Sequence, residues 1–140
     1  MSRRRARELA LTALFQWDLV KQNPYTALER AFTEEALPGG SQEFARRLVS
    51  GTLEHIEAID QEISWHLEDW RLERLANVDR NILRIAVFEL LYLADVPLSV
   101  AINEAVELAK VYGGPDSSKF INGVLGRIAE KLRTTPDTEP

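Results

Sequence analysis

One stretch of the sequence, DRNILRIAVFELLYLA over 79–94, is almost entirely apolar around its circumference when it is drawn as a helix. A helix that faces solvent on one side carries an apolar stripe on the other, whereas a helix that is apolar all round needs neighbours on every side. The apolar side chains of this stretch include Ile82, Leu83, Ile85, Ala86, Val87, Leu90 and Leu91. We therefore predict a helix over 79–94 in the middle of a helical bundle.

The rest of the 140-residue chain has the same helical periodicity and no strand-like alternation. It predicts helices over 2–20 (with Ser2 as a candidate cap), 23–36, 41 to about 63, and 99–112, a short helix or turn within 68–80, and a last helix after 118. The expected fold is all-α, a bundle of about seven helices. We expect one helical domain over 1–133, in two small subdomains of about 1–70 and 71–133, followed by a disordered polar tail over 134–140.

Turn and cap residues separate these predicted helices. Asn23 and Pro24 are typical of a helix start, and Ser99, after a proline, is a candidate cap for the helix that follows it. GGPDSS at 113–118 combines a glycine stop with new cap residues. Gly51, inside the long helix predicted from 41, marks either a bend or a close contact with another helix.

Positive charge is concentrated at the beginning of an otherwise acidic chain. The formal net charge is −5, yet Arg3, Arg4, Arg5 and Arg7 contribute four positive charges, so the remaining residues carry nine net negative charges. These arginines also occupy the positive end of a helix dipole, where acidic residues are favoured. The arginines are either a solubilising terminus or are compensated by a group outside the fold, for which a nucleic-acid backbone is the natural candidate.

Composition excludes several classes of protein and site. The chain has no cysteine, so disulfides and thiolate metal sites are excluded, and no segment is apolar and long enough to cross a bilayer. Gln16 and Asp18 interrupt the apolar run that a signal peptide would need. We expect a soluble cytoplasmic protein.

Residues suited to catalysis are few. His55 and His66 lack a metal-ligand spacing, and the surrounding acids Glu54, Glu57, Asp60, Glu62, Glu68 and Asp69 are most simply a solvated helix face. The glycines at 113–114 lack the Lys-Ser/Thr ending of a phosphate-binding loop. We expect no enzymatic activity, no cofactor and no metal; a carboxylate-dependent enzyme is the least favoured alternative.

Two features favour binding instead. Tyr112, Ser117, Ser118, Lys119 and Phe120 offer an aromatic surface, a cation and a helix start around one loop, which suits a single-stranded nucleic acid. On the first helix, Leu11, Phe15 and Leu19 lie opposite the main apolar stripe. This helix is therefore either buried on two sides or presents an apolar face to a partner.

Three long stretches together resemble one known family. RRRARELALTALFQW at 3–17, VDRNILRIAVFELL at 78–91 and DVPLSVAINEAVELAKVYGGPDSSKFINGVL at 95–125 are similar to the NusB family of bacterial transcription antitermination factors. The resemblance implies a helical fold of two small bundles without catalytic activity. It also implies a partner, NusE, which is a protein of the small ribosomal subunit, and binding of the boxA element of nascent RNA, notably during ribosomal RNA synthesis by RNA polymerase.

The resemblance also implies positions for two binding faces. The RNA face would comprise Arg3, Arg4, Arg5, Arg7, Tyr112, Asp116, Ser117, Lys119, Phe120 and Asn122, with Asp116 weakening binding by repulsion and so tuning the affinity. The NusE face would comprise Phe15, Glu73, Asp79 and Arg80, although Asp79 is equally interpreted as a helix cap. Some family members form homodimers that cover the RNA face. A helical adaptor that binds only protein remains the main alternative.

Overall fold

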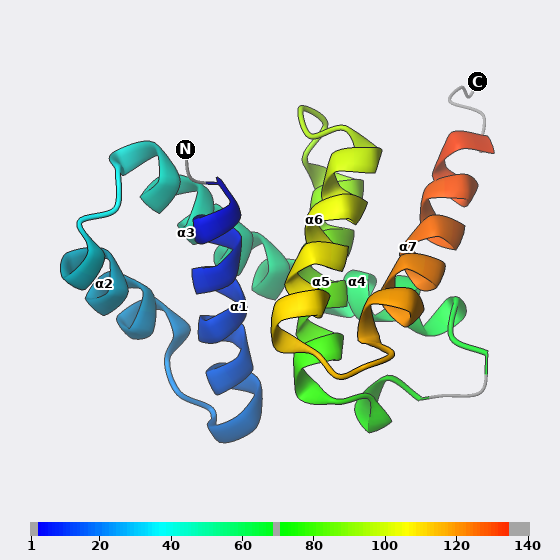
Figure 1. Cartoon of the computed structure of the whole chain (residues 1–140), viewed down its shortest axis with the longest axis horizontal. Coiled ribbons are helices and arrows are strands. Elements are labelled where there is room, and N and C mark those ends of the chain that lie inside the picture. The colour runs from blue at the N-terminus through cyan, green and yellow to red at the C-terminus, as the bar shows by residue number, and fades with distance from the viewer. Residues whose placement is uncertain (1–2, 69–70, 135–140) are drawn as a thin grey trace.

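The structure is a computed structural model that describes residues 3–68 and 71–134 (Figure 1). Within these ranges the chain forms seven α-helices and one 3₁₀ turn, without strands, which confirms the all-α prediction. The helices are α1 (Arg3–Val20), α2 (Pro24–Glu35), α3 (Gly39–Glu54), α4 (Ile56–Trp65), η1 (Leu72–Arg74), α5 (Asn77–Tyr92), α6 (Leu98–Tyr112) and α7 (Ser117–Thr134). The predicted cap Ser2 and the predicted tail beyond 134 lie outside the described residues.

Helix α5 is the centre of the bundle, as its sequence predicts. All ten residues from 81 to 90 are buried, and α5 packs against α1, α3, α4, α6 and α7. One hydrophobic cluster contains residues from all seven α-helices. A subdomain boundary near residue 70 therefore stays a prediction, because α5 contacts helices on both sides of it.

Helix starts agree with the predicted caps only in part. The Asn23 side chain accepts hydrogen bonds from the backbone of Tyr25 and Thr26, as a cap before Pro24 should. Helix α6, however, begins at Leu98 without a side-chain cap, so Ser99 lies in its first turn. Helix α5 begins at Asn77, which places Asp79 in its first turn and corrects the interpretation of Asp79 as the cap.

The prediction of one long helix from residue 41 is wrong. This segment forms two helices, α3 and α4, which are separated at His55, whose φ of −110° and ψ of 23° leave the helical range. The His55 ring stacks on Tyr92 of α5, with 4.0 Å between ring centroids. Gly51 lies within α3 and is the close helix contact. A Cβ there would lie 2.1 Å from Cζ of Phe88, so only glycine lets α3 approach α5 so closely.

Helix α1 packs against α2, α3 and α5, and in Figure 1 α2 and α5 lie on either side of it. Its buried residues include Leu11, one of the three side chains opposite the main apolar stripe, which fits the first of the two predicted alternatives, a helix buried on two sides. Phe15 is half-buried and Leu19 is exposed. Helix α1 is therefore buried on two sides for its first three turns and opens to solvent only toward its end.

Candidate functional site

The exposed arginines at the start of α1 are already paired within the fold. Arg4 donates two hydrogen bonds to Glu104 of α6, at 3.0 and 2.9 Å, and these bonds hold the pKa of the Glu104 carboxyl below its ordinary value. Arg5 donates to Glu35 of α2 and, at 2.8 Å, to Glu8. The hydrogen bond to Arg5 likewise lowers the pKa of Glu35.

Arg7 is a buried structural residue rather than a surface cation. Its side chain is 4% exposed and donates two hydrogen bonds, at 2.8 and 2.7 Å, to Glu89 on the central helix, itself 1% exposed. The expectation that Arg7 shares an accessible basic surface with its neighbours is therefore wrong. Arg7 lies one turn deeper in the bundle than Arg3, where α1 packs against α5, and its side chain meets Glu89 in the last turn of α5.

Arg3 remains exposed and makes looser contacts. Its guanidinium lies 4.2 Å from the ring centroid of Phe44 and 3.8 Å from a carboxylate oxygen of Asp95. Carboxylates of this chain thus pair with all four arginines. Compensation by a group outside the fold, one of the two alternatives, is therefore not required.

Most of the predicted residues at the end of α6, in the following loop and at the start of α7 are exposed to solvent. Tyr112 is 40% exposed, and Asp116, Lys119 and Asn122 are also exposed. Ser117 is buried, and its hydroxyl accepts a hydrogen bond from the Gly114 amide at 2.9 Å, so it shapes the loop from inside. Phe120 is half-buried against the core.

The arginines and the α6–α7 connection lie at opposite ends of the bundle in Figure 1, and no hydrogen bond or ion pair joins them among the described residues. Helices α1 and α6 run side by side, with Arg4 on Glu104 (Figure 1). Tyr112 lies eight residues farther along α6, about 12 Å at the helical rise per residue. A small pocket of about 40 Å³ between α1 and α6 is lined by Arg4, Glu8, Glu104, Glu107, Leu108 and Val111, so three carboxylates lie beside Arg4 on the way to Tyr112.

The predicted partner-face residues come from the end of α1, from η1 and from the start of α5. Phe15 is half-buried and Glu73 is exposed. One oxygen of Asp79, Oδ1, is buried without a hydrogen-bond partner among the described residues. Asp79 also lines an open cleft of about 570 Å³ whose other residues are Arg74, Leu75, Ala76, Gly114, Pro115, Asp116, Ser117 and Phe120. This cleft joins the predicted partner face to the predicted RNA loop.

Arg80 does not lie on that face as an exposed contact. Its side chain is 14% exposed; Nε donates to Asp18 at 2.9 Å, and Nη1 donates to the carbonyls of Leu75 at 2.8 Å and Leu72 at 3.4 Å. Arg80 is thus too buried for the direct contact with a partner that the resemblance implied, and that expectation is corrected. Arg80 instead holds the segment that precedes α5.

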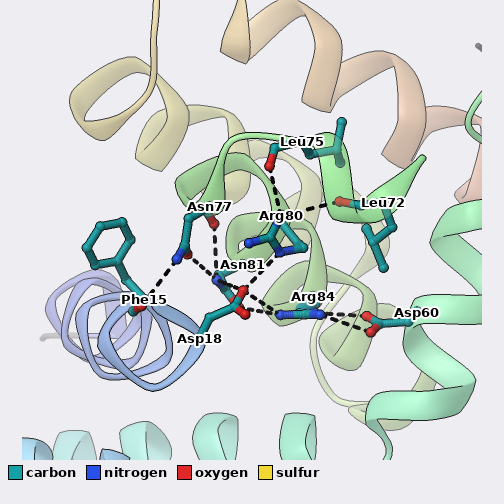
Figure 2. A network of polar contacts seen from close by, with 9 residues as sticks. All are labelled: Phe15, Asp18, Asp60, Leu72, Leu75, Asn77, Arg80, Asn81 and Arg84. Atoms are coloured by element: carbon teal, nitrogen blue, oxygen red, sulfur yellow. Dashed lines mark hydrogen bonds and ion pairs between the residues drawn. The ribbon is translucent and has the colours of Figure 1, made fainter. Parts of the chain in front are cut away.

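Arg80 belongs to a set of polar contacts that sequence reasoning missed, which we call the α5 polar network: Asp18, Asp60, Arg80, Asn81 and Arg84 (Figure 2). Arg84 donates two hydrogen bonds to Asp60, at 2.8 and 3.0 Å, and one to Asp18 at 3.0 Å. Asp60 is thus no part of a solvated face. The available signal was the presence of Arg80 and Arg84 within a helix otherwise predicted to be buried.

Across 3–68 and 71–134, no cluster of three or more histidine, aspartate or glutamate side chains has a geometry suited to a metal ion. No helix in the same ranges is long and apolar enough to span a membrane.

Comparison with known proteins identifies the family. The model of the NusB family matches residues 4–130. The chain belongs to the NusB family. The transcription antitermination protein NusB of Desulforamulus reducens is 55% identical over 132 residues, covering 93% of this chain and 91% of that protein. The protein of the same name from Pelotomaculum thermopropionicum is 51% identical, covering 93% and 90%.

Solved NusB structures share the fold of this family member. NusB of T. maritima superimposes with a TM-score of 0.87 at 43% identity, covering 94% of this chain and 92% of that one. A chain from the crystal structure of antitermination factors NusB and NusE in complex with double-stranded RNA gives a TM-score of 0.82 at 35% identity, covering 94% and 99%. The family's fold is thus present over the whole described bundle.

Proposed function

We propose that this chain is a transcription antitermination factor that binds boxA RNA together with NusE and supports processive transcription, notably of ribosomal RNA. This proposal rests on membership of the NusB family over residues 4–130, and a related chain has been solved in a complex with NusE and RNA. In this proposal the protein acts in the cytoplasm, within the RNA polymerase antitermination complex, as a binding protein without catalytic activity or cofactor.

The proposed RNA face combines the exposed cations at the start of α1 with the loop before α7. Arg3, Arg4, Arg5 and Lys119 supply positive charge, Tyr112 and Phe120 supply aromatic surface, and Asn122 supplies a polar side chain. Exposed aromatic rings stack on unpaired bases, and cations contact the phosphates between them. Asp116, also exposed, lowers the affinity by repulsion. Arg7 and Ser117 support this face from the interior.

The proposed NusE face comprises Phe15, Glu73 and Asp79. Phe15 offers apolar surface at the point where α1 leaves the core, and Glu73 offers an exposed charge on η1. The unpartnered Oδ1 of Asp79 can accept a hydrogen bond from a donor supplied by the partner. These three residues surround one end of the bundle, next to the RNA loop.

A protein-binding adaptor without RNA binding is the second candidate, and one observation favours it. The guanidiniums of Arg4 and Arg5 already hold carboxylates of this chain at hydrogen-bond distance. If these pairs persist, the start of α1 has little free positive charge to offer to phosphates.

Fluorescence anisotropy of a labelled boxA RNA, with and without NusE and over a series of salt concentrations, tests the proposal. We expect binding that NusE strengthens and that weakens with salt. Lys119→Ala should reduce the salt slope by about 0.7 for a single strand. Arg30→Ala removes one exposed charge from α2, away from the proposed face, and is the matched control.

The outcomes separate the two candidates. Association with NusE without any RNA binding would support the adaptor. A homodimer that covers the RNA face would also abolish RNA binding, and light scattering of the same sample distinguishes it by mass. Equal salt slopes for Lys119→Ala and Arg30→Ala would contradict the assignment of Lys119 to the RNA face.

A further inference from the structure

The α5 polar network is charge-balanced and centred on one carboxylate oxygen. Oδ2 of Asp18 accepts hydrogen bonds from Nε of Arg80 at 2.9 Å, Nδ2 of Asn81 at 3.0 Å and Nη1 of Arg84 at 3.0 Å. The second carboxylate, Asp60, pairs with Arg84 alone. Two carboxylates thus neutralise two guanidiniums, and Asp18 is the member that joins α1 to both arginines (Figure 2).

The Asp18 side of this network reaches the backbone beneath the proposed NusE face. Through Arg80 it holds the carbonyls of Leu72 and Leu75, on either side of Glu73. Through Asn81 it contacts the side chain and carbonyl of Asn77, whose Nδ2 donates to the carbonyl of Phe15 at 3.3 Å. Hydrogen bonds through Arg80 and Asn81 therefore connect Asp18 to the backbone at Phe15 and on either side of Glu73. The third face residue, Asp79, directly precedes Arg80 in the chain.

The Asp60 side of the network reaches this face only indirectly. Asp60 lies on α4 and has no hydrogen bond to Arg80 or Asn81; it pairs with Arg84, one turn farther along α5 than Arg80, and only the Nη1 of Arg84 continues to Oδ1 of Asn81 at 3.1 Å. Both carboxylates pair with Arg84, Asp60 through two hydrogen bonds and Asp18 through one, but Asp18 alone bonds directly to Arg80 and Asn81, which hold residues 72–77. Comparing substitutions of the two carboxylates therefore distinguishes a role in positioning residues 72–77 from a general contribution to stability.

We propose that Asp18 is a positioning residue for partner binding: through Arg80 and Asn81 it fixes the relative placement of Phe15, Glu73 and Asp79. This inference rests on the proposed function, because it assumes that these residues form the NusE face. The end of α1, η1 and the start of α5 come from segments that are distant in the sequence. A partner that contacts all three requires their spacing to be set before it binds.

The test compares Asp18→Asn with Asp60→Asn in the full chain. Both changes replace one carboxylate partner of Arg84 by an amide, and both should lower the thermal unfolding midpoint. We expect Asp18→Asn to weaken NusE affinity by about tenfold, measured by calorimetry, while Asp60→Asn stays within about twofold of the unsubstituted chain. Hydrogen exchange of the amides of residues 72–77 should accelerate only in Asp18→Asn.

Arg80→Lys provides an independent variant if Asp18→Asn folds poorly. Lysine keeps the charge opposite Asp18 but lacks the planar fork that reaches the Leu72 and Leu75 carbonyls, so NusE affinity should fall as in Asp18→Asn. Equal losses of affinity in Asp18→Asn and Asp60→Asn, or unchanged exchange at 72–77, would overturn the positioning role. An unsubstituted chain that does not bind NusE would instead overturn the proposed function, while the exchange data still decide whether Asp18 holds the segment.

Discussion

At the scale of single residues, the pair between Arg7 and Glu89 shows how burial changes the role of an arginine. Both side chains are almost fully buried and joined by two hydrogen bonds. Removing one member of a buried pair leaves an uncompensated charge, which costs about 3–5 kcal/mol. We expect Arg7→Ala to lower the free energy of unfolding by that amount in a urea titration.

A double substitution separates charge from packing at this site. Arg7→Met with Glu89→Met removes both charges while keeping apolar volume, so it should recover most of the lost stability. Recovery would show that the unpaired carboxylate causes the loss. A double variant as unstable as Arg7→Ala would contradict this and assign the loss to packing, including that of Arg7 against Phe44, 5.2 Å away.

Glu35 is a residue whose removal should strengthen RNA binding. It occupies two donors of Arg5, a cation of the proposed RNA face. Replacing Glu35 leaves Arg5 with Glu8 as its carboxylate partner within the described residues, and freeing its other donors should raise boxA affinity by about two- to fivefold, as measured by anisotropy with Glu35→Gln. Glu34→Gln is the matched control, because Glu34 is exposed on the same helix and has no ion pair within the described ranges. Equal gains for both variants would mean that net charge, not release of Arg5, sets the affinity.

At the scale of elements, the contact between α3 and α5 depends on Gly51. A side chain there would meet the Phe88 ring at 2.1 Å, so Gly51→Ala should cost about 1–3 kcal/mol of unfolding free energy by overpacking. Gly126→Ala is the control: it also lies inside a helix, α7, but has no neighbour within 4 Å. It should stabilise the protein by about 0.5–1 kcal/mol. Urea titrations of both variants check the opposite signs, and a stable Gly51→Ala would show that α3 can move away from α5.

The sequence predicts a helix where the pattern of neighbouring residues determines it, but it does not predict which helices pack against each other. The apolar circumference of α5 and the Asn23–Pro24 start of α2 follow from neighbouring residues alone. The break at His55 has no proline or glycine to signal it and coincides with stacking on Tyr92, which is distant in the sequence. Local periodicity carries no information on such a contact, so one long helix was predicted instead of two.

The same limit applies to the candidate site. Sequence patterns pointed to the arginines and to residues around the 113–116 connection, but the partners of those arginines lie up to 100 positions away, as for Arg4 and Glu104. Pairing over such separations is set by the packing of α1 against α5 and α6. That packing turned Arg7 and Arg80 from predicted contacts into internal supports.

At the scale of the whole molecule, ion pairs link helices that are distant in the sequence. Arg4–Glu104 joins α1 to α6, Arg5–Glu35 joins α1 to α2, Arg46–Glu29 joins α3 to α2, and Asp18 joins α1 to α5. Hydrogen bonds from arginine lower the pKa of Glu104, Glu35 and Glu29. Burial alone raises the pKa of Asp18, but hydrogen bonds from Arg80 and Asn81 and the charges of Arg84 and Arg80 hold it below its ordinary value.

These shifts predict the direction of the pH dependence of stability. A carboxyl whose pKa is lower in the folded state contributes stability that is complete above its unfolded value and is lost as pH falls through the folded one. The ordinary values are 4.5 for glutamate and 3.8 for aspartate. We therefore expect the contribution of these four carboxyls to be constant near neutral pH, to decline from about 4.5 and to continue falling below 3.8.

Urea titrations between pH 7 and pH 3 measure this loss, and Asp18→Asn identifies one source. Its amide does not titrate, so the variant should be less stable at pH 7 yet lose less stability between pH 5 and pH 3 than the unsubstituted chain. Because Asp18 lies among buried groups, this difference should persist in 1 M salt, which screens the exposed pairs of Glu35 and Glu29. Parallel pH profiles for the variant and the unsubstituted chain would show that Asp18 has the same pKa in the folded and unfolded states.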